Sequence, residues 1–211
     1  MTEWKLWEGD APPFFTTPEF FAAHPWIEPV HQIGHAERTE MVAEVIDDLC
    51  EFRLVDSFLD LGCGDGSLLY MIRDMRPHAK LRGITASLDD ATHAYAKGLD
   101  GVEIGDFLNR PLHWEQVTVM TEVLEHLVDP HGLLKRIGSE YLVASSPSAE
   151  TGDWHYEHHA WAWDLDGYST LVEDAGWHVI SQRECVSEKS YDHGTGIFQP
   201  LRFQVVVCER S

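Results

Sequence analysis

The sequence has little positive charge and few cysteines. Its 211 residues hold 15 Lys and Arg against 36 Asp and Glu, a formal net charge of −21. Wide binding along a nucleic-acid backbone depends on Lys and Arg that neutralise phosphates, so a nucleic-acid partner is not expected. The four cysteines (Cys50, Cys63, Cys185 and Cys208) form no Cys-x-x-Cys pair and no tight spacing. They indicate buried or incidental thiols in a reducing compartment.

Long apolar runs are also lacking. No stretch approaches the roughly 20 residues that a membrane helix needs, so we expect no membrane partner. The first residues, Met1 to Lys5, have neither the basic nor the apolar region of a signal peptide, and we expect a cytoplasmic protein. Apolar residues make up 44% of the chain, too many for a disordered protein. The length suits one domain with a short appendage.

Residues 1–34 differ from the rest in their aromatic and proline content. Seven of the chain's aromatic residues lie here, and five prolines interrupt any long helix. A segment so rich in aromatic side chains must pack onto the main domain. We therefore predict an aromatic-rich helical cap over residues 1–34 and a single α/β domain over residues 35–211.

From residue 35 onwards, helix and strand patterns alternate. A buried stripe predicts a first helix, and it consists of Met41, Val42, Val45, Ile46, Leu49 and Phe52. Strands are expected at 57–61, 80–85, 102–104, 117–120 and 141–144, and helices from 67 and at 88–97, 130–137 and 167–175. Two further strands, 177–184 and 203–208, would flank a hairpin loop at 187–200. This alternation is typical of βαβ units, and we predict a doubly wound, Rossmann-like α/β fold.

Three glycines alternate in residues 60–66 (DLGCGDG), directly after an expected strand and before an expected helix. Glycine permits a tight turn and the close approach of a ligand, and the helix offers unpaired N–H groups. A dinucleotide would favour glycine at position 67, where Ser67 stands, and an acid about 20 positions on, where the second strand ends at Thr85. The alternative ligand is S-adenosylmethionine, which has no pyrophosphate and whose loop keeps an acid at the strand end, here Asp60.

Residues 58–66 (FLDLGCGDG) resemble motif I of the class I S-adenosylmethionine-dependent methyltransferases. Four later segments resemble the same family in the same order: 83–87 (GITAS), 104–107 (IGDF), 121–130 (TEVLEHLVDP) and 175–179 (AGWHV). The resemblance covers about residues 40–211. It implies a seven-stranded, mostly parallel sheet with an antiparallel terminal strand. It also implies methyl transfer from S-adenosylmethionine to a small metabolite or natural-product intermediate.

The resemblance further implies which residues bind the cofactor. They are Asp60, Gly62, Cys63, Gly64, Gly66, Thr85, Ala86, Ser87, Asp106, Phe107, Thr121 and Glu122. The glycine loop would hold the methionine and ribose parts, and residues 106–107 would border the adenine. Most relatives carry Asp or Glu where Thr85 stands, and the Gly-Ile-Thr-x-Ser form is similar to a branch that includes C-methylating and cyclopropane-forming enzymes. How the ribose is held therefore stays open.

Candidate proton acceptors follow the strand at 117–120. Glu122, Glu125 and His126 have i, i+3, i+4 spacing, which predicts one helix face near the carboxyl edge of the sheet. A second cluster, residues 154–163 (WHYEHHAWAW), follows the next strand and can reach the same edge. Methyl transfer from a sulfonium requires alignment and sometimes removal of a proton. The expected catalytic residues are His126, His159, Glu122 and Glu125, with either histidine as the base.

The same four side chains have the composition of a divalent-metal site. Hen1-type RNA methyltransferases use a Glu-x-x-Glu-His run and a distant histidine to bind a metal, and residues 122, 125, 126 and 159 match those positions. Because Glu-Val-Leu-Glu-His also occurs in methyltransferases without metal and this chain is acidic, we expect a small-molecule acceptor and no metal. The alternatives are a metal-assisted, Hen1-like RNA 2′-O-methyltransferase and a non-catalytic S-adenosylmethionine-binding module. The acceptor atom and the oligomeric state stay open.

Overall fold

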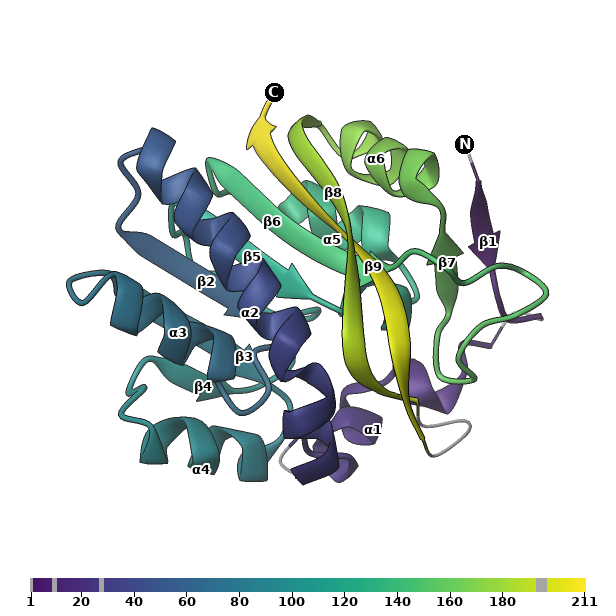
Figure 1. The fold of residues 1–211 in the computed structure, drawn as a ribbon, viewed down its shortest axis with the longest axis horizontal. Helices are drawn as coiled ribbons and strands as arrows, with labels where there is room; N and C mark the ends of the chain where they lie inside the picture. The colour runs from purple at the N-terminus through teal and green to yellow at the C-terminus, as the bar shows by residue number, and fades with distance from the viewer. Residues whose placement is uncertain (1, 9–10, 27–28, 193–196) are drawn as a thin grey trace.

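A seven-stranded sheet in the order β4-β3-β2-β5-β6-β9-β8 forms the centre of the computed structural model, which describes residues 2–8, 11–26, 29–192 and 197–211 (Figure 1). The strands are β2 (Ser57–Leu61), β3 (Lys80–Thr85), β4 (Val102–Ile104), β5 (Val117–Thr121), β6 (Tyr141–Pro147), β8 (Trp177–Asp192) and β9 (Ile197–Arg210). Strands β2 to β6 pair in parallel, and β9 runs antiparallel to both β6 and β8. This arrangement confirms the predicted fold class.

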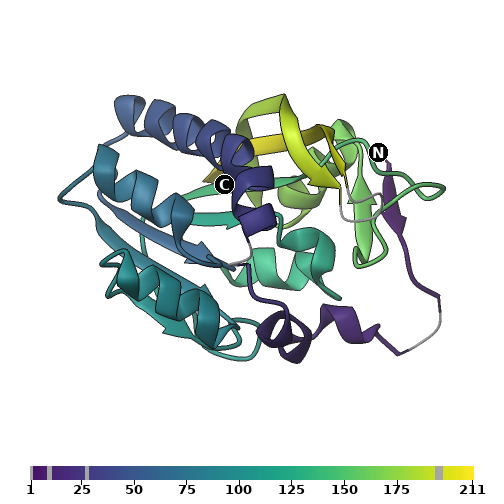
Figure 2. The same ribbon diagram turned by 60° about the horizontal axis from the view of Figure 1, so that its bottom comes forward.

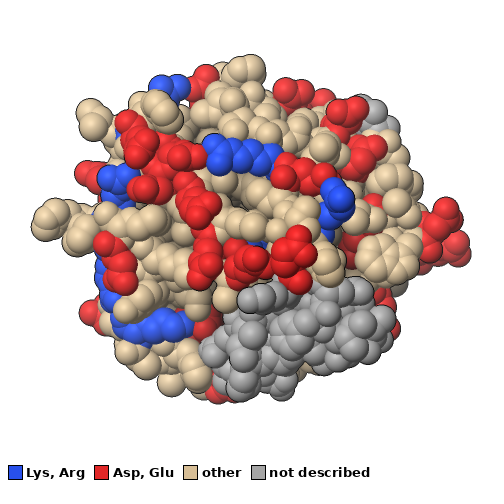
Figure 3. Space-filling view, in the orientation of Figure 1, with Lys and Arg blue, Asp and Glu red and all other residues tan. Residues whose placement is uncertain are grey.

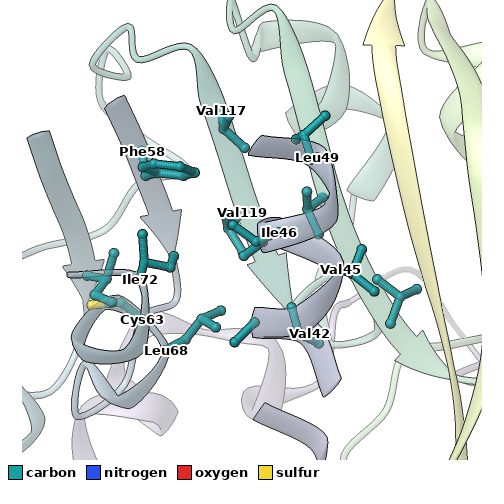
Figure 4. Packing of buried hydrophobic residues seen from close by; sticks show 14 of the residues in the cluster. Val42, Val45, Ile46, Leu49, Phe58, Cys63, Leu68, Ile72, Val117 and Val119 are labelled. Atoms are coloured by element: carbon teal, nitrogen blue, oxygen red, sulfur yellow. The ribbon is translucent and has the colours of Figure 1, made fainter. Parts of the chain in front are cut away.

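Helices cover both faces of the sheet, and each face has its own hydrophobic core. One face carries α2 (Pro29–Phe52), α3 (Ser67–Met75) and α4 (Leu88–Ala96), and the other carries α5 (Pro130–Arg136) and α6 (Leu165–Asp174). Figure 4 shows the first core, in which Val42, Ile46 and Leu49 of α2 pack towards Val117 and Val119 of β5. The prediction that Phe52 belongs to this stripe is wrong: Phe52 is the last residue of α2 and is 77% exposed.

The N-terminal segment adds a small second sheet that the sequence did not predict. Strand β1 (Glu3–Lys5) pairs antiparallel with β7 (Trp161–Trp163), and the Trp163 indole N–H donates to the Glu3 carboxylate. The chain then forms a 3₁₀ turn, η1 (Phe14–Thr16), and helix α1 (Pro18–Ala23), which Thr17 caps. Helix α1 lies below the edge at which the parallel strands end (Figures 1 and 2). Helix α2 begins at Pro29 and so crosses the predicted boundary at residue 34.

Two local predictions are wrong. Residues 187–200 are not a hairpin loop, since β8 extends to Asp192 and β9 begins at Ile197, with paired positions as far out as Asp192 and Ile197. Two strands that pair with each other satisfy their backbone groups without the apolar side chains that sequence patterns detect. Residues 122–126 do not form an α-helix either. They form a turn followed by the 3₁₀ helix η2 (Leu124–His126), because Asp129 caps a new helix that starts at Pro130.

Acidic side chains are more prominent than basic ones on the face of the molecule in Figure 3, as the net charge of −21 implies. Among the described residues, no helix combines the length and the apolar content that crossing a bilayer requires. The parallel strands β2, β3, β5 and β6 all end at the same edge of the sheet, and this edge is where we look for a ligand site.

Candidate active site

A cavity of about 1000 Å³ lies at the carboxyl ends of the parallel strands. The strand-end loops form its floor, and residues of α1 and α2 close it from the other side. Most of the predicted site residues line it: Asp60, Gly62, Cys63, Gly64, Thr85, Ala86, Asp106, Phe107, Thr121, Glu122, His126 and His159. Gly66, Ser87 and Glu125 lie behind this lining. The volume is at the upper end of the range of about 300–1000 Å³ for ligand sites.

The three glycines of the loop between β2 and α3 have positive φ angles of 83°, 49° and 75° at Gly62, Gly64 and Gly66. A Cβ at Gly62 would come within 2.7 Å of Val123, and one at Gly66 within 2.6 Å of Leu99. These two positions are therefore needed for packing. A Cβ at Gly64 would make only ordinary contact, at 3.5 Å from the Trp26 side chain, so the backbone that lines the cavity at this position has room for a side chain.

Asp60 at the end of β2 is buried, and its Oδ1 has no hydrogen-bond partner among the described residues. Burial raises the pKa of Asp60 to about 7. A buried carboxylate without a partner is costly, and a ligand cation removes that cost. Asp60 and the Gly64 backbone together suit a ligand that has an ammonium group near Asp60 and a second part packed against the glycine loop.

Strand β3 ends in hydroxyl groups that are used locally. The Thr85 hydroxyl accepts a hydrogen bond from the Ser87 N–H at 3.3 Å, and the Ser87 hydroxyl accepts one from the Asp90 N–H at 3.2 Å, which caps α4. Asp90 lines the cavity, is buried and accepts a 2.7 Å hydrogen bond from the Trp26 backbone N–H of the cap. The sequence prediction missed Asp90, although its position three residues after a serine was a signal for the start of a helix.

Asp106, expected near the adenine, uses both carboxylate oxygens within its own loop. They accept hydrogen bonds from the Leu108 N–H at 2.7 Å and the Asn109 side chain at 2.6 Å. The adjacent Phe107 is half-buried beside the cavity. These bonds fix the loop, so Asp106 contributes shape at this end of the cavity.

Glu122 has a φ angle of 56°, a left-handed conformation that is strained in a residue other than glycine. Its carboxylate accepts hydrogen bonds from Arg38 of α2 at 3.0 Å and from the Ser145 hydroxyl of β6 at 2.7 Å. The ion pair with Arg38 is largely buried. This conformation directs the Glu122 carboxylate, fixed by its ion pair with Arg38, to the floor of the cavity. No sequence pattern had pointed to Arg38.

Glu125, His126 and His159 meet beside this floor. One donor atom from each residue lies within 4.8 Å of the other two, and the two imidazole rings are 4.7 Å apart at 80°. Both carboxylate oxygens of Glu125 are buried without a hydrogen-bond partner among the described residues. The predicted cluster therefore does form. Glu125 and His126 come from η2 and His159 from the loop before β7, and not from one face of an α-helix as predicted.

Hydrogen bonds fix the orientation of both imidazoles. His126 Nδ1 donates to the His158 carbonyl at 2.9 Å, which leaves Nε2 as a lone-pair donor. His159 Nδ1 lies 2.6 Å from the Glu150 carboxylate, a residue that the sequence prediction missed. An ionised Glu150 carboxylate only accepts, so in that state His159 Nδ1 donates to it and Nε2 of His159 is also left free. Burial lowers the pKa of each histidine to about 3, so both rings are neutral near pH 7.

Burial acts in the opposite direction on the acids of the cluster. It raises the pKa of Glu150 to about 7, and it raises the pKa of Glu125 well above the usual range, with further contributions from the charges of Glu122 and Glu150. Two neutral nitrogen donors and a carboxylate without a partner form a set that can bind a divalent metal or accept a proton.

The family model of methionine biosynthesis protein MetW matches residues 42–158, more than half of the chain. The chain belongs to the MetW family. The matched residues include the glycine loop, Asp90 and the run from Glu122 to His126. His159 and the whole cap lie outside the match, so this member of the MetW family completes its cavity with segments that the family model does not describe.

Solved structures with the same architecture are distant in sequence. Magnesium protoporphyrin IX methyltransferase from Synechocystis PCC 6803, with bound S-adenosylhomocysteine, has a TM-score of 0.65 at 13% identity and covers 94% of this chain and 97% of its own. The methyltransferase domain of a bacterial Hen1 has a TM-score of 0.55 at 18% identity and covers 82% and 97%. The 4+2 cyclase SpnF has a TM-score of 0.60 at 12% identity and covers 80% of each chain. No curated protein matches the sequence.

At these identities the likeness establishes the class I methyltransferase fold of this MetW-family chain. It does not establish the reaction, since a cyclase has the same architecture and function belongs to the site and not to the fold. The chemistry must therefore be argued from the cavity itself.

Proposed function

We propose that this MetW-family protein transfers a methyl group from S-adenosylmethionine to a small molecule bound in the cavity. The observation that carries the proposal is that Asp60, a buried acid whose Oδ1 has no partner among the described residues, lines the same cavity as the Gly64 backbone. These two residues suit the ammonium group and the ribose of the methyl donor. The loop lacks the spacing that a pyrophosphate would need.

The cofactor supplies a methyl group that is already activated as a sulfonium substituent. The protein has to align the acceptor, exclude water and remove a proton where the acceptor carries one. Asp60 would pair with the ammonium group, and the cap helix α1 would close the cavity against water. His126 and His159 are neutral near pH 7, so the Nε2 of each can accept a hydrogen bond from the acceptor, while a pKa of about 3 makes each a weak base.

The remaining cavity suits an uncharged or cationic aromatic acceptor. Phe20 and Phe21 of α1 and Tyr156 of the loop before β7 supply aromatic rings, and each of these rings contacts a histidine. The acids that line the cavity outnumber Arg38, the single Lys or Arg among its described lining residues, and Glu122 is already bound to Arg38. Anionic acceptors are disfavoured by this charge.

Titration calorimetry with S-adenosylhomocysteine tests the cofactor assignment. Gly64→Asn tolerates the left-handed backbone and adds a side chain to the cavity wall, so we expect affinity to fall at least about tenfold. Gly98→Asn is the matched control, because Gly98 has a φ of 76° but lies outside the cavity lining. Wild-type affinity in Gly64→Asn, or no binding by the wild-type protein, would refute the proposal.

Turnover is tested separately from binding. We expect S-adenosylmethionine to be converted to S-adenosylhomocysteine in the presence of a panel of aromatic amines and phenols, and the conversion to fall in His126→Ala and His159→Ala. Tight binding of S-adenosylhomocysteine with no conversion for any acceptor would favour the non-catalytic binding module.

A second candidate is metal-assisted methyl transfer, favoured by one specific observation. The three donors of Glu125, His126 and His159 converge, and both Glu125 oxygens have no other partner among the described residues. A divalent ion there would pair with the Glu125 charge and would grip two adjacent acceptor oxygens, such as the terminal ribose hydroxyls of an RNA. Glu122 fits this role less well, because Arg38 and Ser145 already bind its oxygens.

Calorimetry with Mn²⁺ on the wild-type protein, Glu125→Gln and Glu150→Gln tests this candidate. If the site binds metal, Glu125→Gln abolishes binding, and Glu150→Gln weakens it by about 10- to 100-fold through the His159 orientation. Exposed Glu157→Gln serves as the matched control. If the wild-type protein does not bind Mn²⁺, the metal-assisted candidate is refuted and the metal-free reaction remains.

A further inference from the structure

The capping of α4 does not account for the burial of the Asp90 carboxylate. Ser87 caps α4, and an acid three residues later usually returns a hydrogen bond to the backbone N–H of the capping residue. Here the Ser87 N–H donates to Thr85, so the capping box is not closed. The Asp90 side chain lines the cavity instead and accepts from the Trp26 N–H, which uses Oδ1.

Asp90 lies next to the glycine loop, although it belongs to a different element. The N–H groups of Gly62 and Cys63 both donate to the Ile84 carbonyl of β3, at 2.9 and 3.1 Å, which holds the loop against the strand that leads to α4. Trp26 spans the same gap, since its backbone binds Asp90 and its side chain lies over Gly64. Trp26 thus contacts both Gly64 and Asp90, and all three residues line the same cavity.

This carboxylate requires hydrogen-bond donors. Burial raises the pKa of Asp90 to about 6, while the Trp26 N–H and Ser87 act to lower it. The acid is thus ionised near pH 7 and offers more acceptor positions than one backbone N–H fills. Two adjacent hydroxyl groups would fill them, because a carboxylate accepts hydrogen bonds from both members of a vicinal diol.

We propose that Asp90 binds the two ribose hydroxyls of the nucleoside cofactor, in place of an acid at the end of β3. This inference rests on the proposed cofactor, but it assigns a residue and an element that the sequence resemblance did not. Thr85, at the end of β3, is then a turn residue whose hydroxyl orders the start of α4. The Trp26 backbone N–H fixes the Asp90 carboxylate. The Asp90 side chain therefore both holds the cap and binds the ribose.

The test is a double-mutant cycle between the protein and the ligand. Calorimetry measures the affinity of the wild-type protein and of Asp90→Asn for S-adenosylhomocysteine and for its 2′,3′-dideoxyribose analogue. For S-adenosylhomocysteine we expect Asp90→Asn to lose about 10- to 100-fold, the usual effect of a hydrogen bond to a charged group. For the dideoxy analogue the loss should be less than about threefold. Asp89→Asn, on the exposed neighbouring acid, is the matched control.

Equal losses for the two ligands would overturn the inference, since Asp90 would then act on the fold or on the overall charge and not on the hydroxyls. Retained affinity of Asp90→Asn for S-adenosylhomocysteine would also overturn it. Thermal unfolding of Asp90→Asn without ligand identifies any loss of folded protein, and Asp90→Glu should recover part of the affinity for the diol. Failure of the wild-type protein to bind S-adenosylhomocysteine at all would instead refute the proposed function.

Discussion

Individual acids in the cavity are held in positions that favour a ligand over the stability of the free protein. Burial raises the pKa of Asp60, Asp90, Glu125 and Glu150. A shift of this kind means that ionising the group in the folded state costs free energy. Two of these residues, Asp60 and Glu125, have carboxylate oxygens without partners among the described residues, which is typical of positions that bind charged ligands.

Asp60→Asn is therefore expected to stabilise the free protein at neutral pH. Asp60 has a pKa of about 7 in the folded protein against an ordinary value of 3.8, so the wild-type protein loses stability progressively as the pH rises from about 4 to about 7. The variant escapes this loss. Its free energy of unfolding should exceed that of the wild type by an amount that grows from near zero at about pH 4 to on the order of 2–4 kcal/mol at about pH 8.

Urea unfolding across this pH range measures the difference, with exposed Asp89→Asn as the control. A difference that does not change with pH would contradict the raised pKa. Saturating S-adenosylhomocysteine should reverse the order, because its ammonium group pairs with Asp60 in the wild type and not in the variant.

The loop between β2 and α3 uses its glycines for two purposes. Gly66 begins α3 in a left-handed conformation against Leu99 and Ala94, whereas Gly64 opens onto the cavity. Gly66→Ala should destabilise the protein by roughly 2–4 kcal/mol, because the backbone strain adds to a contact of 2.6 Å between the new Cβ and Leu99. Gly64→Ala should cost only about 1–2 kcal/mol, the strain alone.

Thermal and urea unfolding of the two variants, compared with each other, checks this ranking. If Gly64→Ala proves as destabilising as Gly66→Ala, the loop packs tightly throughout and the cavity wall at Gly64 is not open. A cofactor-affinity measurement on Gly66→Ala adds a second distinction, because the surviving folded fraction should bind normally.

Elements with strong periodicity could be predicted from the sequence, and elements held by pairing could not. Strands β2, β5 and β6 lie where the sequence predicts them, because strands buried on both sides are nearly continuous apolar runs. The outer parts of β8 and β9 are polar and pair mainly with each other, so the sequence indicated a loop. Strand β1 has three residues, and its partner β7 lies more than 150 positions away, which no local pattern detects.

The candidate site divides in the same way. The glycine loop and the Glu125–His126 pair carry local motifs, and both line or adjoin the cavity as the motifs imply. Arg38 and Glu150 carry no motif, since their roles depend on partners, Glu122 and His159, that other elements bring near. Residues that bind a ligand common to many proteins are easier to predict from the sequence than the residues that orient them.

The charge of the whole molecule favours a small acceptor over a nucleic acid. With 36 acids against 15 Lys and Arg, and with Arg38 as the single Lys or Arg among the described residues of the cavity lining, the protein offers few partners for phosphates. Single-stranded RNA binding that depends on phosphate contacts weakens with salt in proportion to their number, with a logarithmic slope of about −0.7 for each. A small, uncharged acceptor carries no such dependence.

We therefore expect an RNA oligonucleotide with a free 2′,3′-diol to bind weakly, with a dissociation constant above about 100 μM near physiological salt, and with a slope no steeper than about −1. Fluorescence anisotropy between about 20 and 200 mM NaCl, with and without Mn²⁺, measures both quantities, and a DNA oligonucleotide of the same sequence is the control. A slope of about −2 or steeper, or RNA binding at micromolar concentration that requires Mn²⁺ and disappears in Glu125→Gln, would reverse the order of the two candidates. The acceptor would then be a nucleic-acid end, held by the metal in spite of the charge of the surrounding surface.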